Sequence, residues 1–200
     1  MNSRTIPIRR ALISVSDKQN LIDLGNFLED LGIDLISTGG TARFLKKGGL
    51  SVKEVSDLTG FPEILNGRVK TLHPKVHAPI LFDRDDNSSV KELKKIDAKA
   101  IDLVIVNLYP FETILKGKAT TKKNLIENID IGGVALMRAA AKNFDHVMVV
   151  SDPADYIELK RELTNFQGCT RQRMRKFFAA KAFSQTSYYD HLIAGWFLSK

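Results

Sequence analysis

The sequence has few of the features that mark secreted or membrane-spanning proteins. Cys169 is the single cysteine among 200 residues, so no disulfide can form within the chain, as expected in a reducing compartment. No apolar run approaches the ~20 residues that span a bilayer, because the apolar stretch at residues 101–106 soon meets Asn107 and Pro110. Residues 1–10 lack the apolar centre of a secretory signal. We therefore expect a cytoplasmic chain with no membrane partner.

Motifs for nucleic-acid binding are also missing, although the chain is basic. Lys and Arg total 30 against 23 Asp and Glu, a net charge of +7. No helix-turn-helix pattern, zinc-finger spacing or aromatic-interleaved basic motif is present, so we expect no nucleic-acid partner and consider a small anionic substrate instead. The hydrophobic share of 44% and the charged share of 26% are typical of a globular protein, for which 200 residues suit one domain.

Strand-like and helix-like segments alternate along the chain. Apolar, β-branched runs predict strands at residues 10–15, 33–36, 52–55, 101–108 and 147–150. Three- and four-residue apolar spacing and helix-capping residues predict helices at 21–31, 42–47, 120–128 and 134–143, another beginning at 152–153, and a helical segment at 171–198. This alternation predicts an α/β fold with a mostly parallel sheet flanked by helices and a C-terminal helical segment. Residues 56–86 read as a long, irregular and functional loop.

A first candidate site follows the second predicted strand, where residues 37–41 read STGGT. Hydroxyl groups, accessible backbone N–H groups and a helix N-terminus together suit a phosphate. Ser14, Ser16 and Lys18 end the preceding strand, and neighbouring parallel strands would bring both loops to one sheet edge. The alternative is a simple turn at the glycines with Thr41 capping a helix. The segment is neither a Walker loop nor a dinucleotide fingerprint.

A second candidate site is cationic and lies at residues 68–77. Its chemistry-bearing side chains are Arg68, Lys70, Thr71, His73 and His77. In an extended stretch, Arg68 and Lys70 would point the same way. The two histidines are four apart, as in zinc-binding helices, but Pro74 lies between them and no Glu accompanies them. We therefore expect structural histidines and no metal.

A third group combines an acid, a phenol and a base. Tyr109 follows the clearest strand, Asp130 precedes two glycines at a helix entry, and Lys142 ends an Ala-rich stretch. Asp130 and Lys142 would form a proton-transfer pair if the fold brought them together. Spacing alone leaves other readings open: Asp130 as a helix cap, Lys142 as a helix C-terminal cation, and Tyr109 as a half-buried strand end.

Six motifs in this order carry a family resemblance. They are SVSDK at 14–18, STGGT at 37–41, RVKTLHP at 68–74, NLYPF at 107–111, IDIGG at 129–133 and RAAAKN at 138–143. The chain resembles, from about residue 10 to its last residues, the IMP cyclohydrolase domain of the bifunctional purine biosynthesis enzymes. The resemblance implies one such domain over residues 1–200 with a methylglyoxal-synthase-like fold. It also implies a homodimer without cofactor. A formyltransferase domain, which follows in most relatives, is expected to be absent here and is a candidate partner.

The resemblance also implies an activity and a site. Formamidoimidazole carboxamide ribonucleotide (FAICAR) would close its ring to give IMP and water. The matched catalytic residues are Lys70, supporting the oxyanion, Tyr109, a proton donor, Lys142, the general acid/base, and Asp130, its partner or the group that engages the carboxamide. The matched substrate-binding residues are Ser16, Asp17, Lys18, Ser37, Thr38, Gly39, Gly40, Thr41, Arg68, Thr71, Asn107, Ile131 and Gly132.

Two departures and two rival functions accompany this interpretation. Pro79 stands where relatives commonly have Gly, and Phe144 stands where His is frequent; Pro79 restricts the backbone just beyond the cationic loop. A regulatory phosphate-binding domain would use the same fold but would need only the phosphate loops. Methylglyoxal synthase would share the phosphate loop but lack the later motifs.

Overall fold

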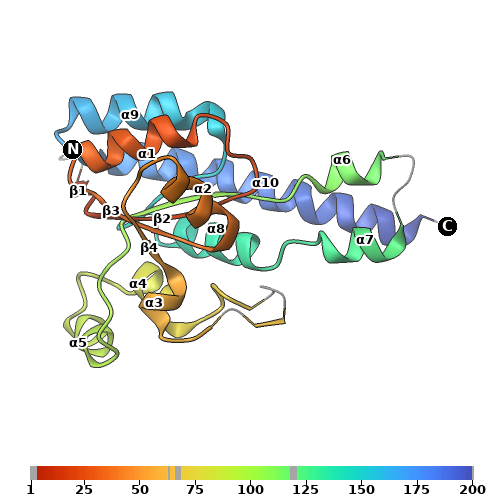
Figure 1. The fold of residues 1–200 in the computed structure, drawn as a ribbon. Helices are drawn as coiled ribbons and strands as arrows, with labels where there is room; N and C mark the ends of the chain where they lie inside the picture. Colours follow the sequence, from red (N-terminus) through yellow and green to blue (C-terminus); the bar gives the residue numbers. More distant parts are fainter. Residues whose placement is uncertain (1–3, 63, 66–68, 118–120, 200) are drawn as a thin grey trace.

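The computed structural model describes residues 4–62, 64–65, 69–117 and 121–199. Its centre is a five-stranded sheet in the order β4-β3-β2-β5-β6, and every neighbouring pair is parallel (Figure 1). The strands are β2 (Arg10–Val15), β3 (Asp34–Ser37), β4 (Val52–Glu54), β5 (Leu103–Asn107) and β6 (Met148–Val150). The predicted α/β fold is confirmed, because five apolar runs form this sheet and helices flank it.

Helices connect the strands and cover the sheet. They are α1 (Leu21–Asp30), α2 (Gly39–Lys47), α3 (Val55–Thr59), α4 (Pro74–Leu81), α5 (Asn87–Lys95), α6 (Phe111–Leu115), α7 (Lys122–Glu127), α8 (Gly132–Lys142), α9 (Tyr156–Asn165) and α10 (Gln172–Leu198), with a 3₁₀ turn at Pro153–Asp155. In Figure 1, α1 and α9 lie together on one side of the sheet, and α3 and α4 on the other. α8 packs on β5, β6 and α10. Among the described residues, no helix is both long enough and apolar enough to cross a bilayer.

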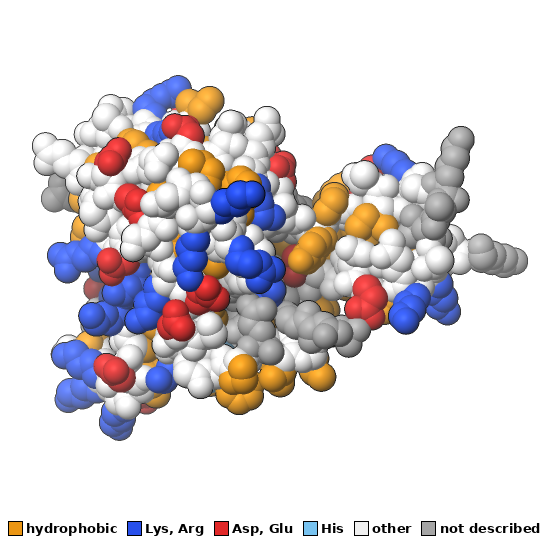
Figure 2. All heavy atoms as spheres, viewed as in Figure 1, with side chains coloured by type: hydrophobic (Ala, Val, Ile, Leu, Met, Phe, Trp, Pro, Cys, Tyr) orange, Lys and Arg blue, Asp and Glu red, His pale blue; other side chains and the backbone are white. Residues whose placement is uncertain are grey.

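The C-terminal half of α10 leaves the sheet and forms an arm with α6 and α7 (Figure 1). The space-filling view shows this arm standing apart from the body of the molecule (Figure 2). The arm has its own small core around Phe111, Leu125 and Tyr189. The Phe111 ring lies edge-on to the Trp196 ring, with 6.0 Å between their centroids. α10 therefore contributes to two packed layers, the sheet's and the arm's.

A second, smaller sheet was not predicted. β1 (Thr5–Pro7) pairs antiparallel with β7 (Cys169–Arg171). Each strand has only three residues, which is too short to show a periodic pattern in the sequence, and β1 also ends in proline. Arg175 lies beneath this ribbon with no exposed surface. Its guanidinium group donates to the backbone carbonyls of the residues at positions 4, 144, 145 and 170. One side chain therefore ties the N-terminal segment to β7 and to the α8–β6 connection.

The stretch 56–86 is more regular than predicted, because it contains most of α3 and all of α4. Pro74 is the first residue of α4, a position where its missing N–H costs nothing. His73 caps that helix, since its Nδ1 accepts a hydrogen bond from the Lys75 N–H at 3.1 Å. Pro79 is buried inside α4. The glycines of STGGT also differ from the prediction, because they form the first turn of α2 rather than a loop.

Candidate active site

The sheet order creates a crevice at the carboxyl ends of β2 and β5. From the central β2 the chain runs outward through β3 and β4, then returns to β5 on the other side. In open α/β sheets, ligands bind at such a reversal point. The last residues of the two strands, Val15 and Asn107, lie opposite each other. The predicted meeting of the first two loops is confirmed here, since the Ser14 and Thr38 hydroxyl oxygens are 3.3 Å apart.

Asn107 fixes the loop after β2. Its Oδ1 accepts hydrogen bonds from the N–H groups of Ser16 at 2.7 Å and Asp17 at 2.9 Å. Its Nδ2 donates to the Asp17 carbonyl at 2.9 Å. Lys18 folds back over the same loop, and its Nζ donates to the Ser16 carbonyl at 3.2 Å. The amide of Asn107 is thus used to shape the crevice.

Two hydroxyl groups of STGGT also support the strand ends. The Ser37 hydroxyl donates to the Ile13 carbonyl at 2.6 Å, and the Thr41 hydroxyl donates to the Val15 carbonyl at 2.9 Å. Both side chains are buried. The alternative reading of Thr41 as the helix cap is wrong, because Thr38 is the N-cap residue of α2.

The N-terminus of α2 is open to an anion. Thr38 makes no side-chain cap bond, and its carbonyl accepts from the third and fourth N–H groups of the turn, those of Thr41 and Ala42. Among the described residues, the N–H groups of Gly39 and Gly40 have no such partner. Gly39 has φ +41°, a left-handed value that favours glycine. Lys and Arg side chains gather over α2 on the face shown in Figure 2.

Asp130 lies at the N-terminus of α8, close to residues from two other motifs. Its Oδ1 accepts a hydrogen bond from the Gly133 N–H at 2.7 Å, and the backbone N–H of Tyr109 also donates to the carboxylate. Burial raises the pKa of Asp130, while these two N–H groups and the positive charge of Lys70 oppose the rise. The structure therefore brings Tyr109 and Asp130 together within reach of the positive charge of Lys70, and the Asp130 carboxylate also binds the N–H group of the second residue of α8, whose N-cap residue is Ile131.

The two glycines after Asp130 allow this close packing. A Cβ atom on Gly132 would lie 2.9 Å from the Thr71 Oγ1, and one on Gly133 would lie 2.5 Å from the Asp130 Oδ2. Thr71 is buried against this turn. Ile131, which lies between Asp130 and Gly132 in the chain, is 61% exposed. The first turn of α8 therefore connects the cationic loop to the carboxylate.

Lys142 lies at the other end of α8. α8 begins two residues after Asp130, and at a rise of 1.5 Å per residue its first and last residues, Gly132 and Lys142, lie about 15 Å apart along the helix axis. Lys142 is exposed there. Within one chain the structure does not form the predicted Asp130–Lys142 pair, because Asp130 precedes the first turn of α8 and Lys142 is the last residue of that helix. Lys142 therefore has the alternative role, that of a cation at a helix C-terminus. Arg68, another predicted site residue, lies outside the described residues.

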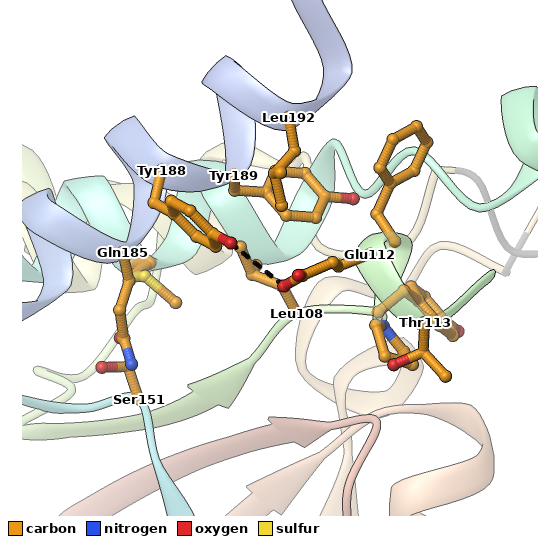
Figure 3. Close-up of a pocket in the computed structure, with 12 residues that line it drawn as sticks. Leu108, Glu112, Thr113, Ser151, Gln185, Tyr188, Tyr189 and Leu192 are labelled. Carbon is orange, nitrogen blue, oxygen red and sulfur yellow. Dashed lines mark hydrogen bonds between the residues drawn. The ribbon is translucent and has the colours of Figure 1, made fainter. Parts of the chain in front are cut away.

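Sequence reasoning missed a pocket beside Tyr109. It has a volume of about 250 Å³, below the usual range for ligand pockets, and lies between the β5–α6 connection and α10 (Figure 3). The Tyr188 hydroxyl donates to Glu112 across it at 3.1 Å. Tyr189, which lines the pocket, also reaches Asp130. No periodic or motif signal in the sequence indicates that contact, because it joins residues 59 positions apart.

One cluster outside the crevice has metal-ligating side chains. Asp83, Asp85 and His146 approach one another, but Arg4 already binds both carboxylate oxygens of Asp85. The buried His146 Nδ1 has no hydrogen-bond partner, whereas a metal-bound imidazole normally donates its second N–H group. These residues fit an ion-pair network better than a metal centre.

Family models match most of the chain. Residues 20–135 match the MGS-like domain, and residues 140–200 match the AICARFT/IMPCHase bienzyme family. The first span contains the α2 N-terminus, Tyr109 and Asp130, and the second contains Lys142 and Tyr189. Together the two matches confirm the resemblance indicated by the six motifs.

Individual relatives agree with the family models. The chain is 50% identical over 192 residues to the bifunctional purine biosynthesis protein PurH of Agrobacterium fabrum, and 52% identical over 191 residues to that of Parvibaculum lavamentivorans. The alignments cover 96% and 95% of this chain but 36% and 35% of those proteins, so the chain spans about a third of their length. The crystal structure of ForH matches with a TM-score of 0.83 at 36% identity, covering 94% of this chain and 97% of that one. The chain therefore belongs to the MGS-like domain family, in the part of that family represented by the PurH purine biosynthesis proteins.

Proposed function

We propose that this chain is an IMP cyclohydrolase, which closes the ring of FAICAR to give IMP and water. The carboxamide nitrogen attacks the formyl carbon, so an N–C bond forms and the formyl oxygen becomes a hydroxyl group. That C–O bond then breaks and the hydroxyl leaves as water. The reaction needs removal of an amide proton, stabilisation of a developing oxyanion and protonation of the leaving hydroxyl. The observation that carries the proposal is the partly buried Asp130 carboxylate, which accepts the backbone N–H groups of Gly133 and Tyr109 and interacts with the positive charge of Lys70.

Each residue of this group suits one of those steps. Burial raises the pKa of Asp130, which makes its carboxylate a better base toward the carboxamide proton. The ammonium group of Lys70 stabilises the oxyanion. The Tyr109 side chain is 49% exposed, so its hydroxyl is free to give a proton to the leaving group, while its backbone N–H orients Asp130. The general acid/base role of Lys142 stays a sequence-based prediction, and the geometry of one chain gives it no contact with Asp130.

The substrate phosphate fits at the N-terminus of α2. The N–H groups of Gly39 and Gly40 and the helix dipole would bind it, and Lys18 would add a positive charge at the neighbouring loop. Asn107 would act indirectly by keeping that loop in place. The phosphate would then lie at the β2–β3 end of the crevice and the reacting base toward Asp130.

Purified protein is expected to convert FAICAR into IMP in the presence of EDTA and without folate, because no step above uses a metal or a cofactor. Ultraviolet absorbance follows the formation of the purine ring. Loss of conversion on adding EDTA, with recovery on adding a divalent cation, would contradict the proposed roles of the side chains.

Gly133→Ala is expected to lower kcat for this reaction by about 10–100-fold, because the new methyl group would displace the Asp130 carboxylate. The helix itself tolerates alanine better than glycine. Gly195→Ala is the matched control, since a Cβ there meets no atom within 4 Å. Cyclisation rates and thermal unfolding of both variants provide the comparison. Equal kcat values for the two variants would remove Asp130 from the reacting group.

A regulatory phosphate-binding domain is the second candidate, favoured by the open N-terminus of α2 and the MGS-like match. Such a domain would bind IMP or inorganic phosphate without converting FAICAR. It would leave the Asp130 group without a use. Methylglyoxal formation from dihydroxyacetone phosphate would identify the third possibility, a synthase.

The proposal extends to partners and compartment. The PurH relatives are named bifunctional and are about three times as long as the matched span, which supports a formyltransferase as the source of FAICAR. We also propose that the protein is a cytoplasmic homodimer, as the family resemblance implies. Light scattering of the purified protein tests the dimer directly.

A further inference from the structure

Tyr189, on α10, contacts the segment that joins α7 to α8. Its side chain is 94% buried, and its ring lies edge-on to Phe111 with 6.2 Å between the centroids. Its hydroxyl oxygen accepts a hydrogen bond from the Asp130 N–H at 2.8 Å. The same hydroxyl donates to the Asn128 carbonyl at 3.2 Å. The hydroxyl group therefore acts as both donor and acceptor toward the short segment that contains Asp130.

This hydroxyl completes a set of contacts that fixes Asp130 from both sides. The Asp130 backbone is tied to Tyr189, and its carboxylate is tied to the N–H groups of Gly133 and Tyr109. Asp130 belongs to no helix or strand, so its own segment does not determine where the carboxylate lies. Packing around Phe111 holds the Tyr189 ring in place and therefore the position of its hydroxyl.

We propose that Tyr189 is a positioning residue for the cyclisation, holding the Asp130 backbone so that its carboxylate meets the substrate carboxamide. This inference rests on the proposed function. It assigns α10, which lies outside the crevice, a role in the rate of ring closure. Substrate binding should depend on it little, because the phosphate site is at α2, at the β2–β3 end of the crevice.

The neighbouring tyrosine provides a matched control. Tyr188 is 54% exposed, and its hydroxyl binds Glu112 rather than the Asp130 segment. Figure 3 shows the Tyr188 hydroxyl directed toward Glu112 and the Tyr189 hydroxyl directed away from it. Replacing either tyrosine by Phe removes one oxygen atom from the same turn of α10. Only the change at position 189 releases Asp130.

Tyr189→Phe is expected to lower kcat about 10–100-fold, because a displacement of about 1 Å in a reacting group has an effect of that size. Its KM and its affinity for IMP should stay within about threefold of the wild-type values. Tyr188→Phe should keep kcat within about twofold. Steady-state cyclisation of FAICAR and calorimetric titration with IMP measure these quantities. A Tyr189→Phe kcat equal to that of Tyr188→Phe, or a rise in KM as large as the fall in kcat, would overturn the inference.

A second measurement does not depend on how the variant folds. In the wild-type protein the Asp130 amide proton should exchange with solvent slowly, because the Tyr189 hydroxyl accepts it in a part-buried hydrogen bond. Exchange as fast as that of an open loop amide would overturn the inference. If the wild-type protein shows no cyclisation, the proposed function fails. If it is active while the two Phe variants behave alike, only the role of Tyr189 fails.

Discussion

Asp130→Asn is expected to lower kcat for ring closure by about 10²–10⁴-fold, the usual contribution of a positioned general base. The amide has nearly the shape of the carboxylate and still accepts the Gly133 N–H, but it cannot take the carboxamide proton. Burial raises the pKa of Asp130, so the wild-type rate should increase with pH through a midpoint above the ordinary Asp value of about 3.9. A pH–rate profile of kcat measures both effects.

The stability of the same variant should follow the sign of that pKa shift. The folded-state pKa of Asp130 lies above its unfolded value, so the protonated carboxyl group favours the fold and this contribution is lost as pH rises through the folded-state pKa. The free energy of unfolding of wild type minus that of Asp130→Asn should therefore fall over that pH window. A difference that grows with pH would show that ionised Asp130 stabilises the fold.

Arg175→Ala is expected to lower the free energy of unfolding by about 3–5 kcal/mol. The side chain is fully buried, and its guanidinium group pairs four backbone carbonyls from three separate segments. Alanine would leave a cavity and several unpaired buried carbonyl groups. Burial lowers the pKa of Arg175 to about 10, so the group is still charged at neutral pH and its hydrogen bonds are charge-assisted.

Urea unfolding at pH 7 measures this effect against two other variants. Arg173→Ala changes an exposed arginine on the same turn of α10 and should alter the unfolding free energy by less than about 0.5 kcal/mol. Arg175→Lys keeps the charge but not the planar fork, so it should recover only part of the loss. Equal stabilities for the alanine variants at positions 173 and 175 would refute the idea that this side chain joins the three segments.

Much of the sheet and most of its longer helices were predictable because their signals are local. The apolar run ending at Asn107 predicts a buried parallel strand, and β5 is an inner strand of the sheet, between β2 and β6. The apolar spacing before Gly32 predicts a helix that ends there, where the glycine has φ +72°. The helix α4 was not predicted, because Pro74 argued against a helix there. Pro74 is in fact the first residue of α4, a helical position that suits proline.

By itself, the sequence determined the fold class, the family resemblance and the residue types available for chemistry, because these depend on periodicity and on motifs short enough to read along the chain. Only the tertiary structure decided which of these residues meet. It placed Tyr109 beside Asp130 within reach of the positive charge of Lys70, separated Lys142 by the length of α8, and brought Tyr189 onto the Asp130 backbone. The physical reason is that such contacts depend on strand order and on helix length and packing, which join distant positions without any repeating spacing between them.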